Sequence, residues 1–207
     1  GEAVINPTFS EFGGNPELEP EKNRGFDAGV GVPLKSVNGS LNVTYFEEIL
    51  TDEIAYDLST QRSENQPGDS DRQGIEFTAS ITPLTSLKLQ GSYTYLDAKG
   101  PEGGIEVRRP RNELGLAATW QVPASATSFS GNLRHVRGLF DNENWKKGYP
   151  VVRLPSFTVV NLAAAHEITD AVEVTARVTN VFDEEYQEVL GYATRGRAGY
   201  VGVRASW

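Results

Sequence analysis

The chain has 207 residues, contains no cysteine, and carries 19 basic and 28 acidic side chains, a formal net charge of −9 at pH 7. The acidic balance argues against a nucleic-acid partner, because nucleic-acid-binding proteins normally carry a basic stripe. The absence of cysteine excludes a disulfide scaffold, a thiolate zinc site and a cysteine nucleophile within these residues.

Nine segments alternate between apolar and polar residues, which is the two-residue period of a β-strand. The pattern is clear near Trp120, where Leu114, Leu116 and Ala118 share its face. In chain order, the predicted strands are 24–34, 41–50, 72–82, 87–98, 109–122, 126–138, 156–166, 172–181 and 196–207. Residues 1–5 resemble the end of a further strand. The sequence therefore predicts an all-β protein.

The connections between these strands alternate in length. Short connections are expected at 35–40, 83–86, 123–125 and 167–171, and long ones at 51–71, 99–108, 139–155 and 182–195. This rhythm favours an antiparallel up-and-down sheet with all its long loops at one end, as in outer-membrane β-barrels.

The length of the strands and the chemistry of their faces favour a transmembrane barrel. A strand that spans a membrane needs about 9–11 residues, more than soluble strands average. One face carries hydroxyl, amide and glycine residues, which suits a wet interior. The other face is apolar, and the aromatic residues expected to form an interfacial girdle are Tyr93, Tyr95, Trp120 and Trp207. A large soluble β-barrel or sandwich is the alternative.

The number of predicted strands is odd, whereas bacterial single-chain barrels close with an even number. We therefore expect residues 1–207 to form the carboxy-terminal part of a longer barrel, about nine strands of it.

Several short motifs support a family resemblance. The stretch from Val178 to Tyr186 is followed by Gly191-Tyr192, Gly196-Arg197 and a strand that ends in Trp207. This order resembles the carboxy-terminal signature of TonB-dependent outer-membrane receptors. Segments similar to other motifs of the family occur at 6–12, 15–21 and 72–76. Segments 54–57, 108–113 and 191–192 are most similar to the vitamin B12 receptor group, although siderophore receptors share much of this frame.

The resemblance implies a barrel of about 22 strands with an amino-terminal plug, energised by the TonB complex through that plug. The plug and the earlier strands would lie outside residues 1–207. The implied function is uptake of a large scarce nutrient, cobalamin or a ferric siderophore, across the outer membrane. A passive, porin-like barrel without a plug is the alternative.

The resemblance also implies partners for the barrel surface. Its outer face would contact lipid and lipopolysaccharide, and its last strand would be recognised by the barrel-insertion machinery. The residues of that signal are Val201, Val203, Ala205 and Trp207.

Residues that could contact a ligand are expected on the long loops, since binding residues concentrate on loops held by a rigid scaffold. They are Tyr56, Asp57, Trp145, Tyr149, Tyr192 and Arg195. Glu64, Asp69 and Asp71 offer oxygen ligands for Ca²⁺, but their spacing lacks the glycine and the distal glutamate of a calcium loop, which favours a solvated acidic loop. We expect no cofactor.

Two further groups in the loops are expected to have structural roles. Asn180, Phe182, Asp183 and Tyr186 interrupt the alternation and predict a structured turn at the end of a strand. Arg108, Arg109 and Arg111 are expected at the rim or in the lumen, paired with acidic side chains. No nucleophile lies at motif spacing from either histidine, so the sequence predicts that the protein is not an enzyme.

Overall fold

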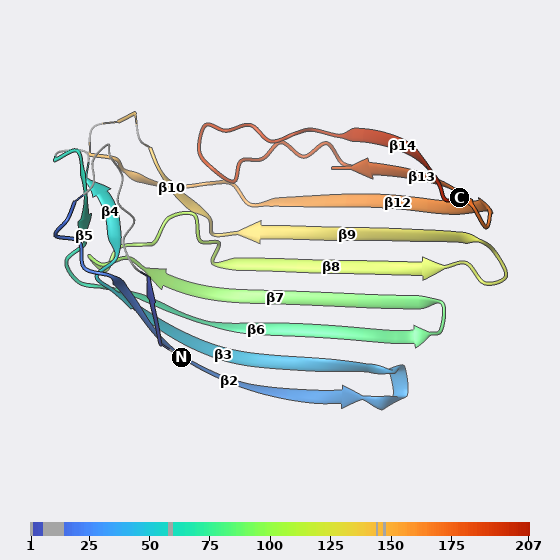
Figure 1. Cartoon of the computed structure of the whole chain (residues 1–207), viewed down its shortest axis with the longest axis horizontal. Helices are drawn as coiled ribbons and strands as arrows, with labels where there is room; N and C mark the ends of the chain where they lie inside the picture. Colours follow the sequence, from blue (N-terminus) through green and yellow to red (C-terminus); the bar gives the residue numbers. More distant parts are fainter. Residues whose placement is uncertain (1, 6–14, 58–59, 144, 147) are drawn as a thin grey trace.

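The computed structural model describes residues 2–5, 15–57, 60–143, 145–146 and 148–207, with the backbone alone for 2–5. Ten strands form one sheet in which all neighbours are antiparallel (Figure 1). In sheet order they are β1 (Glu2–Ile5), β2 (Glu21–Leu34), β3 (Gly39–Thr51), β6 (Asp69–Leu84), β7 (Leu87–Lys99), β8 (Asn112–Gln121), β9 (Thr127–Arg137), β12 (Phe157–Thr169), β13 (Val172–Thr179) and β14 (Ala198–Ala205).

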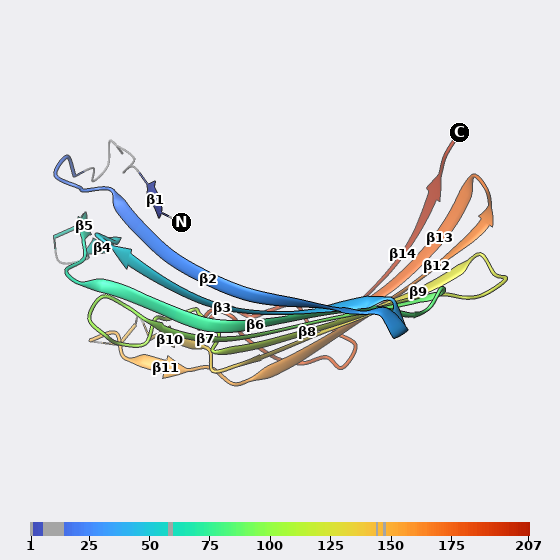
Figure 2. The same ribbon diagram turned by 90° about the horizontal axis from the view of Figure 1, so that it is seen from below.

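The sheet is open, twisted and curved (Figure 2). Within the described residues, its edge strands β1 and β14 do not pair with one another. An open antiparallel sheet of this kind matches the expected fragment of an up-and-down barrel. No helix in the described part of the chain is both long enough and apolar enough to cross a membrane.

All nine predicted strands are confirmed, and the short segment at the start of the chain pairs with β2 as a tenth. The boundaries differ from the predicted ones by at most three residues. Strands β2, β6 and β12 extend three residues further than predicted at one end, whereas β8 is shorter and begins at Asn112 instead of residue 109. Pro110 has no N–H to donate to a sheet ladder, and Arg108 adopts a positive φ of 60°, so regular pairing cannot continue back to residue 109.

Two hairpins inside the long loops were not predicted. They are β4 (Ile54–Asp57) with β5 (Arg62–Asn65), and β10 (Phe140–Asn142) with β11 (Val151–Arg153). Each strand has only three or four residues, which is too short for an alternating pattern to be recognised.

The long and short connections lie at opposite ends of the sheet, as expected. The hairpins β4–β5 and β10–β11 lie at one end, and the short turns, including the single-turn helix η1 (Lys35–Val37), lie at the other (Figure 1). The carboxy terminus lies at the short-turn end. We call the end with the long connections the loop end.

Strand register separates the two faces of the sheet. One row across five strands is apolar or aromatic, and it consists of Val30, Val43, Phe77, Tyr93 and Leu114. The adjacent row faces the other way, and it consists of Gly31, Asn42, Thr78, Ser92 and Gly115. Successive residues of a strand point to opposite faces, so the sheet has an apolar face and a polar face.

The apolar face is exposed rather than buried in a core. Val30 is 67% exposed and Val201 is 81% exposed. At the short-turn end, Trp120 stacks on Phe129 with ring centroids 5.9 Å apart, and both lie in one register row with Val201. Exposed aromatic and aliphatic side chains over a whole sheet face are expected of a barrel wall that contacts lipid.

A small buried cluster lies at the loop end. It consists of Val136, Leu139, Leu154 and Phe157, with Val159, Tyr186 and Leu190 packed against it. Strands β13 and β14 have eight residues each and stop short of this end, so the connection between them, residues 180–197, covers β12 there.

Candidate functional site

The predicted ligand contacts lie on three separate loops at the loop end. Tyr56 and Asp57 are in β4, and Tyr56 is 57% exposed. Trp145 and Tyr149 lie in the connection between β10 and β11, and Tyr192 and Arg195 lie in the connection between β13 and β14. In the described part of the chain, β4 forms a ladder with β5 and with no other strand, so Tyr56 and Asp57 lie on a hairpin separate from the main sheet.

Two of these loops meet at Trp145. The Trp145 indole N–H donates to a Glu143 carboxylate oxygen at 3.0 Å, and a Cβ atom at Gly191 would lie 3.6 Å from the indole ring. Trp145 and Tyr192 nevertheless stay exposed, at 63% and 73%. The structure therefore brings Trp145 beside the segment that carries Tyr192, and both aromatic rings face solvent.

Arg195 is held by β14, the strand that follows it. Its guanidinium donates to the Tyr200 hydroxyl, and the Tyr200 ring lies 4.2 Å from the Arg177 guanidinium. The Arg195 side chain therefore already has a hydrogen-bond partner in the barrel wall.

The three arginines that precede β8 are paired with acidic side chains, as predicted. Arg108 binds Asp141 at 2.9 Å, and Arg109 binds Glu106 at 2.9 Å. Arg111 binds Asp97 at 3.1 Å. The pairs of Arg108 and Arg111 tie the segment 106–111 to a neighbouring loop and strand, and the pair of Arg109 lies within the segment.

Asp141 is the most buried charged residue described, with 1% of its surface exposed. Burial alone would raise the pKa of its carboxyl group. The N–H groups of Leu190 and Asn142 and the Arg108 guanidinium all donate to it, so its pKa lies below the ordinary value of 3.8.

Because the pKa of Asp141 is lower in the folded state, its carboxylate stabilises the loops at any pH above the ordinary pKa. This stabilisation is lost as the pH falls through the lower, folded-state pKa. We expect these loop contacts to be intact at neutral pH and to weaken only below about pH 4. The measurement is the carboxyl ¹³C titration of Asp141, assigned by its disappearance in Asp141→Asn. A midpoint at or above the ordinary value would contradict this prediction.

The predicted structured turn after β13 is present. Asn180 is 3% exposed, and its side chain both accepts from the Glu184 N–H and donates to the Glu184 carbonyl, each at 2.9 Å. An Asp183 carboxylate oxygen accepts the Arg197 N–H at 2.6 Å. The Tyr186 ring contacts Phe157 with centroids 4.2 Å apart, so these residues organise the loop.

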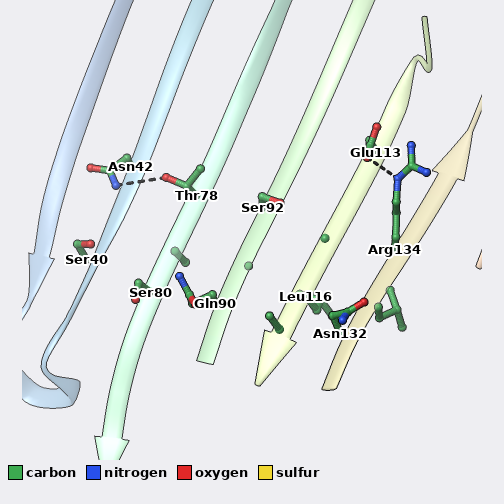
Figure 3. A pocket seen from close by; sticks show the side chains of 15 residues that line it. Ser40, Asn42, Thr78, Ser80, Gln90, Ser92, Glu113, Leu116, Asn132 and Arg134 are labelled. Atoms are coloured by element: carbon green, nitrogen blue, oxygen red, sulfur yellow. Dashed lines mark hydrogen bonds and ion pairs between the residues drawn. The ribbon is translucent and has the colours of Figure 1, made fainter. Parts of the chain in front are cut away.

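A polar hollow of about 520 Å³ on the polar face was not predicted as a site (Figure 3). Hydroxyl and amide side chains from β3, β6, β7 and β9 line it, and the Glu113–Arg134 ion pair, at 2.7 Å, bounds it. The labelled polar residues are Ser40, Asn42, Thr78, Ser80, Gln90, Ser92, Glu113, Asn132 and Arg134. These residues come from separate segments, and the register of the strands brings them side by side. The hollow could therefore not be recognised from the sequence.

The acidic residues considered for Ca²⁺ do not form a metal site in the described part of the chain, where no group of three His, Cys, Asp or Glu side chains could hold an ion. Glu64 is in β5, and Asp69 and Asp71 open β6 with exposed side chains.

A model of the family "TonB dependent receptor-like, beta-barrel" matches residues 3–181. The chain belongs to this family. As a TonB-dependent receptor barrel, it is an outer-membrane protein of a Gram-negative bacterium. The motif at 6–12 lies outside the described residues.

Solved structures of TonB-dependent receptors share this fold. The ferripyoverdine receptor of the Pseudomonas aeruginosa outer membrane is 18% identical, with a TM-score of 0.79 over 99% of this chain and 30% of the receptor. The ferric-catecholate import receptor Fiu of E. coli K12 is 14% identical, with a TM-score of 0.76 over 99% and 32%. The copper transporter OprC is 19% identical, with a TM-score of 0.75 over 100% and 36%.

The chain spans about a third of the length of these structures. The predicted similarity to the vitamin B12 receptor group is not tested by them and stays a prediction.

Proposed function

We propose that residues 1–207 form the carboxy-terminal part of the barrel of a receptor that takes up a large scarce nutrient, cobalamin or a ferric siderophore. The observation that carries this proposal is the family match over 3–181, on a sheet with a polar face and long aromatic-bearing loops at one end. The plug, the earlier strands and the contact with TonB belong to the rest of the protein.

In this proposal the chain forms part of the barrel wall and several of its outer loops, and it catalyses no reaction. The apolar face contacts lipid and, in the outer leaflet, lipopolysaccharide. The polar face offers hydroxyl and amide groups that exchange hydrogen bonds with water, a plug or a passing solute. Among the predicted ligand contacts, Trp145 and Tyr192 are the best placed, because both are exposed on adjoining loops.

The test is uptake by cells that express the complete gene as their only copy. Radiolabelled cyanocobalamin and ferric complexes of a hydroxamate and of a catecholate are supplied at nanomolar concentration, with and without TonB. We expect TonB-dependent accumulation of one of these probes. Accumulation that persists without TonB would instead support the passive, porin-like alternative, as would a coding region without a plug.

The last strand also carries a proposed assembly signal. Val201 and Val203 are 81% and 69% exposed on the apolar face of the edge strand β14, and Trp207 is fully exposed beyond it. We expect removal of Trp207 to lower the amount of folded receptor in the outer membrane several-fold. Heat-dependent migration in gels measures this amount, with Ser206→Ala as the control. An unchanged amount would exclude Trp207 from the signal.

A further inference from the structure

Three connections at the loop end meet at one buried carboxylate. The connection 100–111 contributes Arg108, the hairpin β10–β11 contributes Asp141, and the connection 180–197 contributes Leu190. These segments are far apart in the sequence, so Asp141 joins loops that the strand ladders alone do not connect.

Both oxygens of Asp141 are used. One accepts from the Arg108 guanidinium at 2.9 Å and from the Asn142 N–H at 2.8 Å, and the other accepts from the Leu190 N–H at 2.8 Å. A donor that is withdrawn from water and loses its acceptor costs more than the bond it made. The half-buried N–H groups of Asn142 and Leu190 therefore depend on this side chain, whereas the Arg108 guanidinium is 52% exposed and can bind water instead. Alanine removes every acceptor, whereas asparagine keeps one oxygen.

Further contacts surround this junction and hold the same loops. The Arg108 N–H donates to the Phe140 carbonyl at 2.8 Å, and the Arg134 guanidinium binds Glu188 at 2.9 Å. Trp145 lies beside Gly191, one residue from Tyr192. The junction therefore lies between the two loops whose exposed aromatic rings we propose as ligand contacts.

We propose that Asp141 is a positioning residue that fixes the connections 100–111, 138–156 and 180–197 as one preformed unit, so that Trp145 and Tyr192 present a single aromatic surface. The ligand-facing part of this inference rests on the proposed function, but the coupling of the loops does not. A preformed surface loses less conformational entropy when it binds a ligand than three independent loops would.

The test measures the distance between two of the loops in the unliganded receptor. Spin labels are attached at Lys146→Cys and Ala193→Cys in the complete protein, with any cysteine outside residues 1–207 replaced by serine. Pulsed dipolar spectroscopy then gives the distance distribution. We expect a narrow distribution in the parent protein and one about twice as broad in Asp141→Ala, because the loops then open locally.

Three variants make the result specific. Asp97→Ala removes another loop-end carboxylate that pairs with one arginine, and it should leave the distribution narrow. Arg108→Gln should also leave it narrow, since the Leu190 bond to Asp141 stays. Asp141→Asn should be intermediate, and it keeps the test available if the alanine variant does not fold, as judged by heat-dependent migration.

An unchanged width in Asp141→Ala and Asp141→Asn, or equal broadening in Asp97→Ala, would overturn the proposal. No ligand is present in this experiment, so its outcome is independent of whether the receptor imports cobalamin or a ferric siderophore.

Discussion

Arginine in place of Phe77 is expected to lower the free energy of unfolding of the membrane-inserted receptor by about 2–4 kcal/mol. Phe77 lies on the apolar face in one register row with Val43 and Tyr93, and 39% of its surface is exposed. On a barrel wall, an exposed side chain of that face contacts hydrocarbon, where a guanidinium cannot be hydrated.

The neighbouring residue is the matched control. Thr78 belongs to the polar row, where it accepts a hydrogen bond from Asn42 at 3.3 Å. Thr78→Arg places the same charge one residue away, in a wet interior, and we expect a cost of at most about 1 kcal/mol. Urea-induced unfolding from lipid vesicles measures both variants. Equal costs, or a larger cost at Thr78, would mean that the two faces are assigned the wrong way round.

Replacement of Asn180 by alanine is expected to destabilise the connection 180–197 by about 2–4 kcal/mol, from two causes. The first is the loss of the paired hydrogen bonds with the backbone of Glu184, made by a side chain that is 3% exposed. The second is the backbone, since Asn180 has a φ of +50°, a conformation that alanine adopts only with strain.

Glycine at the same position separates these causes. Asn180→Gly loses the hydrogen bonds but tolerates the positive φ, so it should be about 1 kcal/mol less destabilised than Asn180→Ala. Hydrogen exchange of the amides at Glu184 and Arg197 reports local opening of this loop. If both variants exchange like the parent protein, the turn does not depend on Asn180.

The strands were predictable because their determinants are local. The alternation in segments such as 87–98 indicates which side chains face lipid. The alternation of long and short connections indicates at which end of the barrel each strand begins. The start of β8 was misplaced by three residues, because Pro110 cannot donate a hydrogen bond to the sheet. The hairpins in the loops are too short to leave a pattern.

The site was predictable only in outline. The sequence alone indicated that Trp145 and Tyr192 lie on loops, that Arg108 has an acidic partner, and that Asn180 belongs to a structured turn. It could not indicate that Trp145 lies beside Gly191 or that Ser40, Gln90 and Asn132 line one hollow, because each of these contacts joins separate segments.

The sequence by itself determined the all-β class, the nine long strands, the two faces, the loop end and the family resemblance. Each follows from residue spacing along a strand or from a short motif. Only the tertiary structure decided that Asp141 binds Arg108 and Leu190, residues 33 and 49 positions away. A buried carboxylate needs hydrogen-bond donors, and these can come from any segment that the fold brings close to it. No local sequence pattern indicates which distant N–H groups these will be.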